Sequence, residues 1–136
     1  MLDTLAPFLT AEMGLPLLSS LLTGILIGLD RELQGKPAGL RTHTLVCFAS
    51  TLLTLAATHQ GQWYLNLMPS TQVVSDPTRM AHGILTGIGF LGAGVIFKEG
   101  SSVRGLTTAA SLWITAALGI VYGVGMFELA LVGTWP

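Results

Sequence analysis

The chain has 136 residues, of which 51% are hydrophobic and only 10% are charged. Soluble domains usually carry about 25% Asp, Glu, Lys and Arg, so this composition excludes a disordered chain, a coiled coil and a strongly basic or acidic nucleic-acid binder. The net charge is −1, and the single cysteine, Cys47, excludes an internal disulfide. The sequence predicts an all-α, polytopic membrane protein.

Four charge-free stretches predict four transmembrane helices, because a bilayer span needs about 20 apolar residues. Charged residues such as Asp30 and Arg104 interrupt the stretches, and few charges remain elsewhere to solvate a soluble bundle. We expect helices over residues 13–29, 42–58, 80–97 and 105–127, in a single domain spanning 1–136.

Residues 127–136 predict an incomplete fifth segment. Ten helical residues rise about 15 Å, half of the roughly 30 Å hydrocarbon core. Two alternatives stay open: the segment is the beginning of a longer helix, or it lies at the membrane interface with Trp135 as an anchor.

Basic residues predict the orientation of the bundle. The first connection contains three of them, the third contains two, and the second contains only Arg79. By the positive-inside rule, connections 30–41 and 98–104 are expected to be cytoplasmic, with the N-terminus outside.

Small residues at helical spacing predict tightly packed helix faces of the GxxxG type, because close backbone approach drives helix association in lipid. The third helix carries glycines on two faces, which predicts a central position. Alternatively, a break within residues 89–94 frees backbone carbonyls for an ion. The predicted packing residues are Ser20, Gly24, Gly28, Gly83, Gly87, Gly89, Gly92, Gly94, Ala109, Ala116, Gly119 and Gly123.

Polar residues at the cytoplasmic starts of the second and fourth helices form the candidate site. Thr42 and Thr108 are expected to cap these helices, with Arg41 and Arg104 beside them. Two helix N-termini and two arginines predict an anion site; alternatively, the acidic residues of the first connection neutralise both arginines. The candidate cluster is Asp30, Arg31, Glu32, Arg41, Thr42, Arg104, Thr107 and Thr108.

The sequence shows no set of residues that would make an enzyme. His43, His59 and His82 are widely spaced and have no carboxylate partner at metal-ligand spacing. We expect no catalytic activity and no cofactor, and the pattern leaves a metal ligand undetermined.

The two cytoplasmic junctions resemble each other. Residues 39–42 read GLRT, and residues 105–108 read GLTT. Two helical hairpins related by an axis along the membrane normal would produce this pattern. Chance similarity in a glycine-rich chain is the alternative.

Two longer blocks identify a family resemblance. The first contains LIGLDRE at 26–32 and AGLRTHTLV at 38–46, and the second contains GIGFLGAGVI at 87–96 and VRGLTTAASLW at 103–113. In this order they are similar to the two signatures of the MgtC/SapB family. The resemblance implies a bacterial inner-membrane protein with several helices, usually five, often followed by a soluble cytoplasmic domain. This sequence departs from that pattern in two ways. We expect no soluble domain in it, and we expect its fifth helix to be missing or cut short.

The resemblance also implies a function. Members of the family are linked to growth in scarce Mg²⁺ and, in pathogens, to virulence through survival inside macrophages. A regulatory role, including action on the F-type ATP synthase, has been proposed for them. We therefore expect a non-enzymatic membrane protein that modulates a membrane-protein partner or self-associates in the lipid bilayer, with no nucleic-acid partner. The alternative is a small transporter or ion-binding module for Mg²⁺ or an anion such as phosphate.

Overall fold

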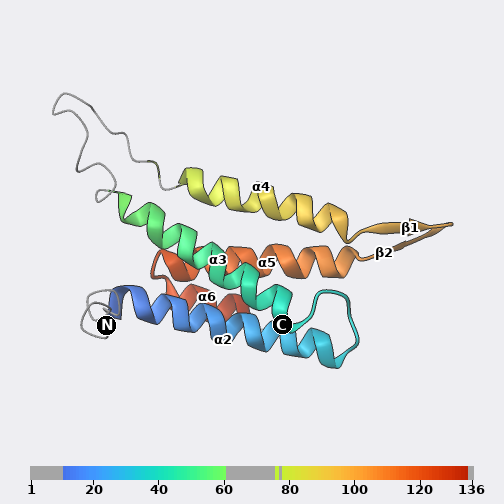
Figure 1. Cartoon of the computed structure of the whole chain (residues 1–136), viewed down its shortest axis with the longest axis horizontal. Helices are drawn as coiled ribbons and strands as arrows, with labels where there is room; N and C mark the ends of the chain where they lie inside the picture. The colour runs from blue at the N-terminus through green and yellow to red at the C-terminus, as the bar shows by residue number, and fades with distance from the viewer. Residues whose placement is uncertain (1–10, 61–75, 77, 135–136) are drawn as a thin grey trace.

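The computed structural model describes residues 11–60, 76 and 78–134, which form five helices and one β-hairpin (Figure 1). In the hairpin, Phe97 pairs with Arg104 and Glu99 with Ser102, antiparallel. The elements are α2 (Ala11–Leu33), α3 (Leu40–Thr58), α4 (Thr78–Gly94), β1 (Phe97–Glu99), β2 (Ser102–Arg104), α5 (Leu106–Gly123) and α6 (Phe127–Thr134).

The described residues contain a helix in each of the four predicted stretches. Three of them, α2, α3 and α5, are long and apolar enough to cross a membrane by length and composition. Helix α4 has 17 residues, which rise about 25 Å, the short end of the spanning range. It runs without a break to Gly94 and then gives way to the hairpin, so the expected helix to residue 97 was wrong.

Helices α3 and α5 pack against each other in parallel. The Thr51 hydroxyl donates to the Gly119 carbonyl oxygen at 2.8 Å. Nearer the N-terminal ends of both helices, His43 lies beside Ser111. The connection 34–39 and the β1–β2 hairpin therefore meet at one end of the bundle, which we call the hairpin end (Figure 1). The other helices surround this pair: α2 packs against α3 and α5, and α4 lies at the outer edge (Figure 1).

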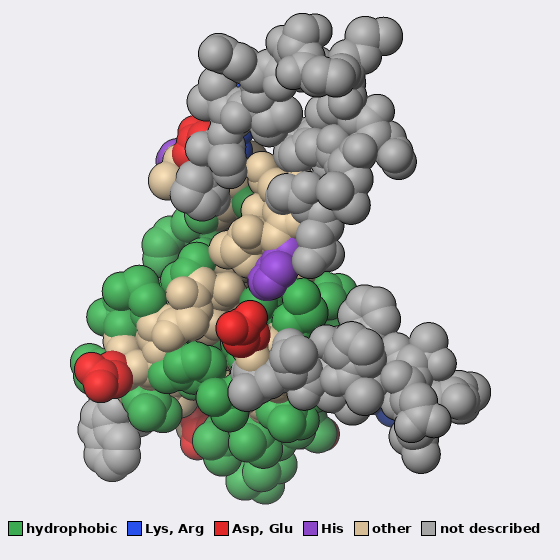
Figure 2. Space-filling model, turned by 90° about the vertical axis from the view of Figure 1, so that its left-hand side faces the viewer, with side chains coloured by type: hydrophobic (Ala, Val, Ile, Leu, Met, Phe, Trp, Pro, Cys, Tyr) green, Lys and Arg blue, Asp and Glu red, His purple; other side chains and the backbone are tan. Residues whose placement is uncertain are grey.

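Among the described residues, the interior of the bundle contains as many polar as apolar residues, and its outside is largely apolar. Large apolar side chains point outward, with Phe90 82% exposed and Leu45 67% exposed. Figure 2 shows hydrophobic side chains over much of the described part of one face. This distribution suits helices that pack through small and hydroxyl-bearing side chains in lipid. The buried polar residues are Ser20, Thr23, Arg31, His43, Ser50, Thr51, Thr54, Thr108 and Thr115.

Helix α6 folds back along α5. Gly125, with φ +80°, provides the left-handed turn between them. Ala130 is fully buried against Leu118 and Tyr122, and the Phe127 ring lies 5.9 Å from the Tyr122 ring between centroids. The predicted fifth segment is therefore an eight-residue helix packed on the bundle, whereas Trp135 lies outside the described residues.

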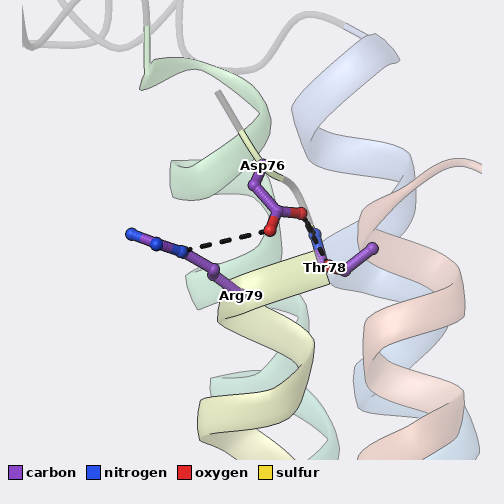
Figure 3. Close-up of polar contacts among 3 residues, drawn as sticks. All are labelled: Asp76, Thr78 and Arg79. Atoms are coloured by element: carbon purple, nitrogen blue, oxygen red, sulfur yellow. Dashed lines mark hydrogen bonds and ion pairs between the residues drawn. The ribbon is translucent and has the colours of Figure 1, made fainter. Parts of the chain in front are cut away.

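Helix α4 begins at a local carboxylate cap (Figure 3). Asp76 Oδ1 accepts hydrogen bonds from the Thr78 backbone N–H at 3.0 Å and the Thr78 hydroxyl at 2.6 Å. The Arg79 guanidinium lies 4.0 Å from the same carboxylate, in a solvent-exposed position. These hydrogen bonds hold the pKa of Asp76 below its ordinary value and favour its charged form at the positive end of the helix dipole.

Candidate functional site

Glycines bring α2 close to α3, and α3 close to α5. A Cβ on Gly24 would lie 2.6 Å from the Thr44 Cα, and one on Gly28 would lie 2.6 Å from the Leu40 Cα. On α5, a Cβ on Gly119 would overlap the Cys47 carbonyl oxygen, and one on Gly123 would lie 2.5 Å from the Thr54 Cβ. These four glycines are therefore packing positions in the structure.

The other predicted packing residues divide into two groups. Ser20 and Ala116 are fully buried, and Gly92 lies against Ala109, whose Cβ is 3.5 Å from a Cβ built on the glycine. The remaining α4 glycines have no neighbour within 4 Å of such a Cβ among the described residues: they are Gly83, Gly87, Gly89 and Gly94. The expectation of a central third helix was wrong, because α4 packs mainly through its Gly92 face and leaves these positions uncovered.

Uncovered glycines help to form an apolar groove between α3 and α4. The groove has a volume of about 510 Å³ and is lined from both helices. Gly83 and Gly87 form part of its α4 wall, whereas Gly89 does not line it. Its lining residues are Leu45, Val46, Ala49, Ser50, Leu53, Met80, Gly83, Ile84, Gly87, Ile88 and Leu91. We call this surface the α3–α4 groove.

Arg31 is the only member of the predicted polar cluster whose charge is buried, at 7% exposure. Its Nη2 donates to the Pro37 carbonyl oxygen at 3.2 Å and to the Thr108 hydroxyl. Its Nε is buried without a hydrogen-bond partner in the described structure. The guanidinium thus connects the end of α2 with the first turn of α5.

The acidic members of the cluster do not neutralise the two predicted arginines. Asp30 accepts a hydrogen bond from the Gln34 side chain at 2.7 Å, and Glu32 accepts one from the Leu40 backbone N–H at 2.9 Å. Glu32 therefore satisfies the start of α3. Arg104 pairs instead with Glu99, at 3.8 Å and in solvent, and Arg41 is exposed.

The predicted threonine caps were also wrong. Gly39 and Gly105 occupy the N-cap positions of α3 and α5, and neither helix start has a side-chain cap hydrogen bond from its N-cap residue. Thr42 and Thr108 lie inside the first turns. Thr42 and Thr107 are exposed, whereas Thr108 is buried against Arg31.

His43 and Ser111 form a second, partly buried polar contact near Arg31. The Gly39 carbonyl oxygen accepts from His43 Nδ1 at 3.1 Å, and His43 Nε2 lies 3.2 Å from the Ser111 hydroxyl oxygen. The Ser111 hydroxyl itself donates to the Thr108 carbonyl oxygen at 2.8 Å. We expected His43 to be an isolated histidine, and Ser111 was not among the predicted site residues. The missed signal is helical spacing, because His43, Cys47 and Ser50 share one face of α3.

A pocket of about 470 Å³ opens beside the Arg31–Thr108 contact at the hairpin end. Gly105, at φ +90°, turns the chain from the hairpin into α5, and a Cβ there would overlap the Val95 carbonyl oxygen. Only glycine fits this close approach. The pocket is lined by Arg31, Lys36, Pro37, Val103, Arg104, Gly105, Leu106, Thr107 and Thr108.

Comparison with known proteins decides the family. The model of the MgtC family matches residues 17–135. The chain belongs to the MgtC family. The matched region includes the α3–α4 groove and the pocket at the hairpin end, and the three apolar helices agree with a membrane location.

Curated relatives from three bacteria are similar to most of this MgtC-family chain. YhiD of Escherichia coli (strain K12) is 39% identical over 126 residues, which cover 93% of this chain and 57% of YhiD. Protein MgtC of Brucella abortus (strain 2308) is 45% identical over 87% of this chain and 45% of its own length. Protein MgtC of Salmonella typhimurium (strain LT2) is 42% identical over 88% of this chain and 47% of its own.

The chain spans about half the length of the curated relatives it matches. No solved structure matches it. The described residues contain no group of three or more His, Cys, Asp and Glu side chains that could hold a metal ion together.

Proposed function

We propose that this chain is a non-enzymatic inner-membrane protein that modulates a membrane partner during adaptation to scarce Mg²⁺. The names of its relatives support the link to Mg²⁺: YhiD of Escherichia coli is named as a candidate magnesium transporter, and two further relatives are named MgtC. The proposal includes four spans, with α4 as the shortest. Connections 30–41 and 98–104 face the cytoplasm, since they contain five of the six basic residues.

The α3–α4 groove carries the proposal. Elsewhere in the bundle, glycines such as Gly28 and Gly119 are covered by a neighbouring helix. On α4, Gly83 and Gly87 line the groove and have nothing within reach of a Cβ in the described structure. Exposed small residues let another helix backbone approach closely in lipid. A transmembrane helix, from another protein or a second copy, is therefore the partner that fits.

The shape of the groove explains why binding there would be specific. Two large side chains that line it, Leu45 and Leu91, are 67% and 49% exposed, and the glycines of α4 line it with them. A partner helix with large apolar side chains at matching spacing would insert them over the glycines. The partner helix would gain dispersion contacts in a fixed geometry. Lipid chains are mobile and do not make contacts in one fixed geometry.

Co-purification from native membranes tests the proposal. Cells grown in scarce Mg²⁺ are extracted in a mild detergent, and the affinity-tagged parent is compared with Gly87→Leu. The leucine side chain would occupy part of the groove, so we expect the variant to fold but to lose the partner or the second copy. Gly89→Leu is the matched control, because it adds the same side chain to the same helix outside the groove.

Three results would contradict the proposal: the parent is recovered as a bare monomer, Gly87→Leu retains its partner, or Gly89→Leu loses the partner to the same extent. Thermal unfolding of both variants confirms that each is folded.

A further inference from the structure

The pocket at the hairpin end has an unbalanced positive charge. Arg31, Lys36 and Arg104 line it, and no Asp or Glu is among its lining residues in the described structure. Glu99 lies close by and pairs with Arg104 at 3.8 Å. Both of these side chains are more than three-quarters exposed, so water screens the pair and an incoming anion can compete with Glu99.

Arg31 is the strongest sign of a ligand. Its side chain is more than nine-tenths buried, and its Nε has no hydrogen-bond partner in the described residues. The groups that do accept from its Nη2, the Pro37 carbonyl and the Thr108 hydroxyl, are neutral. They satisfy hydrogen bonds but do not neutralise the charge, and the ion pairs of the described residues do not include Arg31. A buried charge without a counter-ion is costly, and an anion in the pocket would remove that cost.

The start of α5 lines the same pocket. Gly105 precedes the helix without a side-chain cap, so the backbone N–H groups of the first turn remain free of a capping side chain. The start of α3 differs, because the Glu32 carboxylate already accepts from the Leu40 N–H. The positive end of the α5 dipole therefore adds to the potential at Arg31.

We propose that this pocket binds a phosphate group through Arg31, Arg104, Lys36 and the first turn of α5. An arginine fork and hydroxyl donors such as Thr107 match the oxygens of a phosphate. The phosphate belongs either to the headgroup of an anionic phospholipid or to free inorganic phosphate. This site is separate from the α3–α4 groove and does not depend on the proposed function.

Thermal unfolding of the purified full chain in dodecyl maltoside tests the site. One arm adds sodium phosphate, the other adds dihexanoylphosphatidylglycerol, and sodium chloride at equal ionic strength is the reference. A ligand that binds only the folded protein raises its unfolding temperature in a saturable way. We expect one or both phosphate probes to do so beyond the chloride reference.

Variants locate the binding. Arg104→Gln and Lys36→Gln, at exposed positions, should each raise the half-saturating concentration by about five- to tenfold, the loss of one charge-assisted contact. Arg31→Lys keeps the positive charge but loses the planar guanidinium, and it should raise the half-saturating concentration by a similar factor. Arg41→Gln is the matched control, since Arg41 is also an exposed arginine but does not line the pocket.

Each outcome has one interpretation. A response to sodium phosphate alone assigns free phosphate, and a response to the lipid alone assigns a headgroup; a response to both assigns the phosphate group itself. No response of the parent to either probe overturns the proposal. An equal loss in Arg41→Gln and Arg104→Gln also overturns it. If Arg31→Lys does not fold, Arg104→Gln and Lys36→Gln still decide the test.

Discussion

Arg31 Nη2 donates a hydrogen bond to the Thr108 hydroxyl, across 77 positions of the sequence. The contact is buried and connects the end of α2 with the first turn of α5. It orients a cation beside an uncapped helix start, and both features favour a negatively charged ligand. The packing of the bundle, rather than any local motif, therefore creates the pocket at the hairpin end.

The close approach of α2 and α3 predicts that Gly28→Ala destabilises the protein. A methyl group there would meet the Leu40 Cα at 2.6 Å and the Leu40 carbonyl oxygen at 3.0 Å, so the two backbones must separate. Overpacking of this kind costs about 1–3 kcal/mol. Thermal unfolding in detergent, followed by circular dichroism, measures the loss. Gly83→Ala is the control: its methyl group meets nothing within 4 Å among the described residues, and we expect it to be tolerated. Equal stabilities of the two variants would show that α2 and α3 are not tightly packed.

The buried hydrogen bond between Thr23 and Tyr122, at 2.8 Å, predicts energetic coupling between α2 and α5. Thr23→Val and Tyr122→Phe each remove one hydroxyl with little change of shape. A double-mutant cycle on unfolding should give a coupling of about 0.6 kcal/mol, the average for hydrogen bonds between membrane helices. Strictly additive effects of the two changes would mean that the hydroxyl groups do not interact.

The proposed orientation predicts the labelling pattern of cysteines at the two ends of the bundle. In a Cys47→Ser background, Ser101→Cys at the exposed hairpin tip should not react with a membrane-impermeant thiol reagent added to intact cells. Permeabilising the membrane should restore labelling. Thr58→Cys, at the exposed opposite end of α3, should react without permeabilisation. The reverse pattern would invert the orientation.

The carboxylate cap of α4 predicts a pH dependence. Hydrogen bonds from Thr78 lower the pKa of Asp76 in the folded protein. The cap therefore stabilises the helix start above the unfolded pKa, and this contribution is lost as the pH falls through the folded value. A carboxyl NMR titration should place the Asp76 midpoint below its ordinary value.

Thr78→Val should raise that midpoint, because it removes the hydroxyl donor. Thr86→Val is the control, because the Thr86 hydroxyl donates to the His82 carbonyl oxygen within α4 rather than to Asp76. An unchanged Asp76 midpoint in Thr78→Val would contradict the assigned cause.

The positions of the helices were predictable from runs without charge, but two of their ends were wrong: α2 continues through the charged residues 30–32 to Leu33, and α5 ends at Gly123, before the turn at Gly125. The β-hairpin was not predictable. Its strands have three residues each, which is too short for an alternating pattern. The turns depend on Gly100 at φ +61° and Gly105 at φ +90°. In a chain with 17 glycines, composition does not distinguish these two turn positions from the packing glycines.

The candidate site was predicted in part. Arg31 belonged to the predicted cluster, but the anion site was argued from Arg41 and Arg104, of which only Arg104 lines the pocket. Helical spacing contained the better signal: Arg31 lies seven residues after Gly24 and three after Gly28, on the packed face of α2. The glycines of α4 show a limit of such patterns. Spacing identifies a surface suited to close packing, but it does not say whether the neighbour is in the same chain.

Site-specific photocrosslinking at the edge of the α3–α4 groove tests the proposed partner docking most directly. A photoreactive benzoylphenylalanine replaces Leu91, which lines the groove, or its neighbour Phe90, which is exposed at 82% and does not line it. Cells grown in scarce Mg²⁺ are irradiated, and cross-linked proteins are identified by mass spectrometry. We expect a discrete protein adduct from position 91 and none from position 90. No adduct at position 91, or the same adducts from both positions, would contradict it.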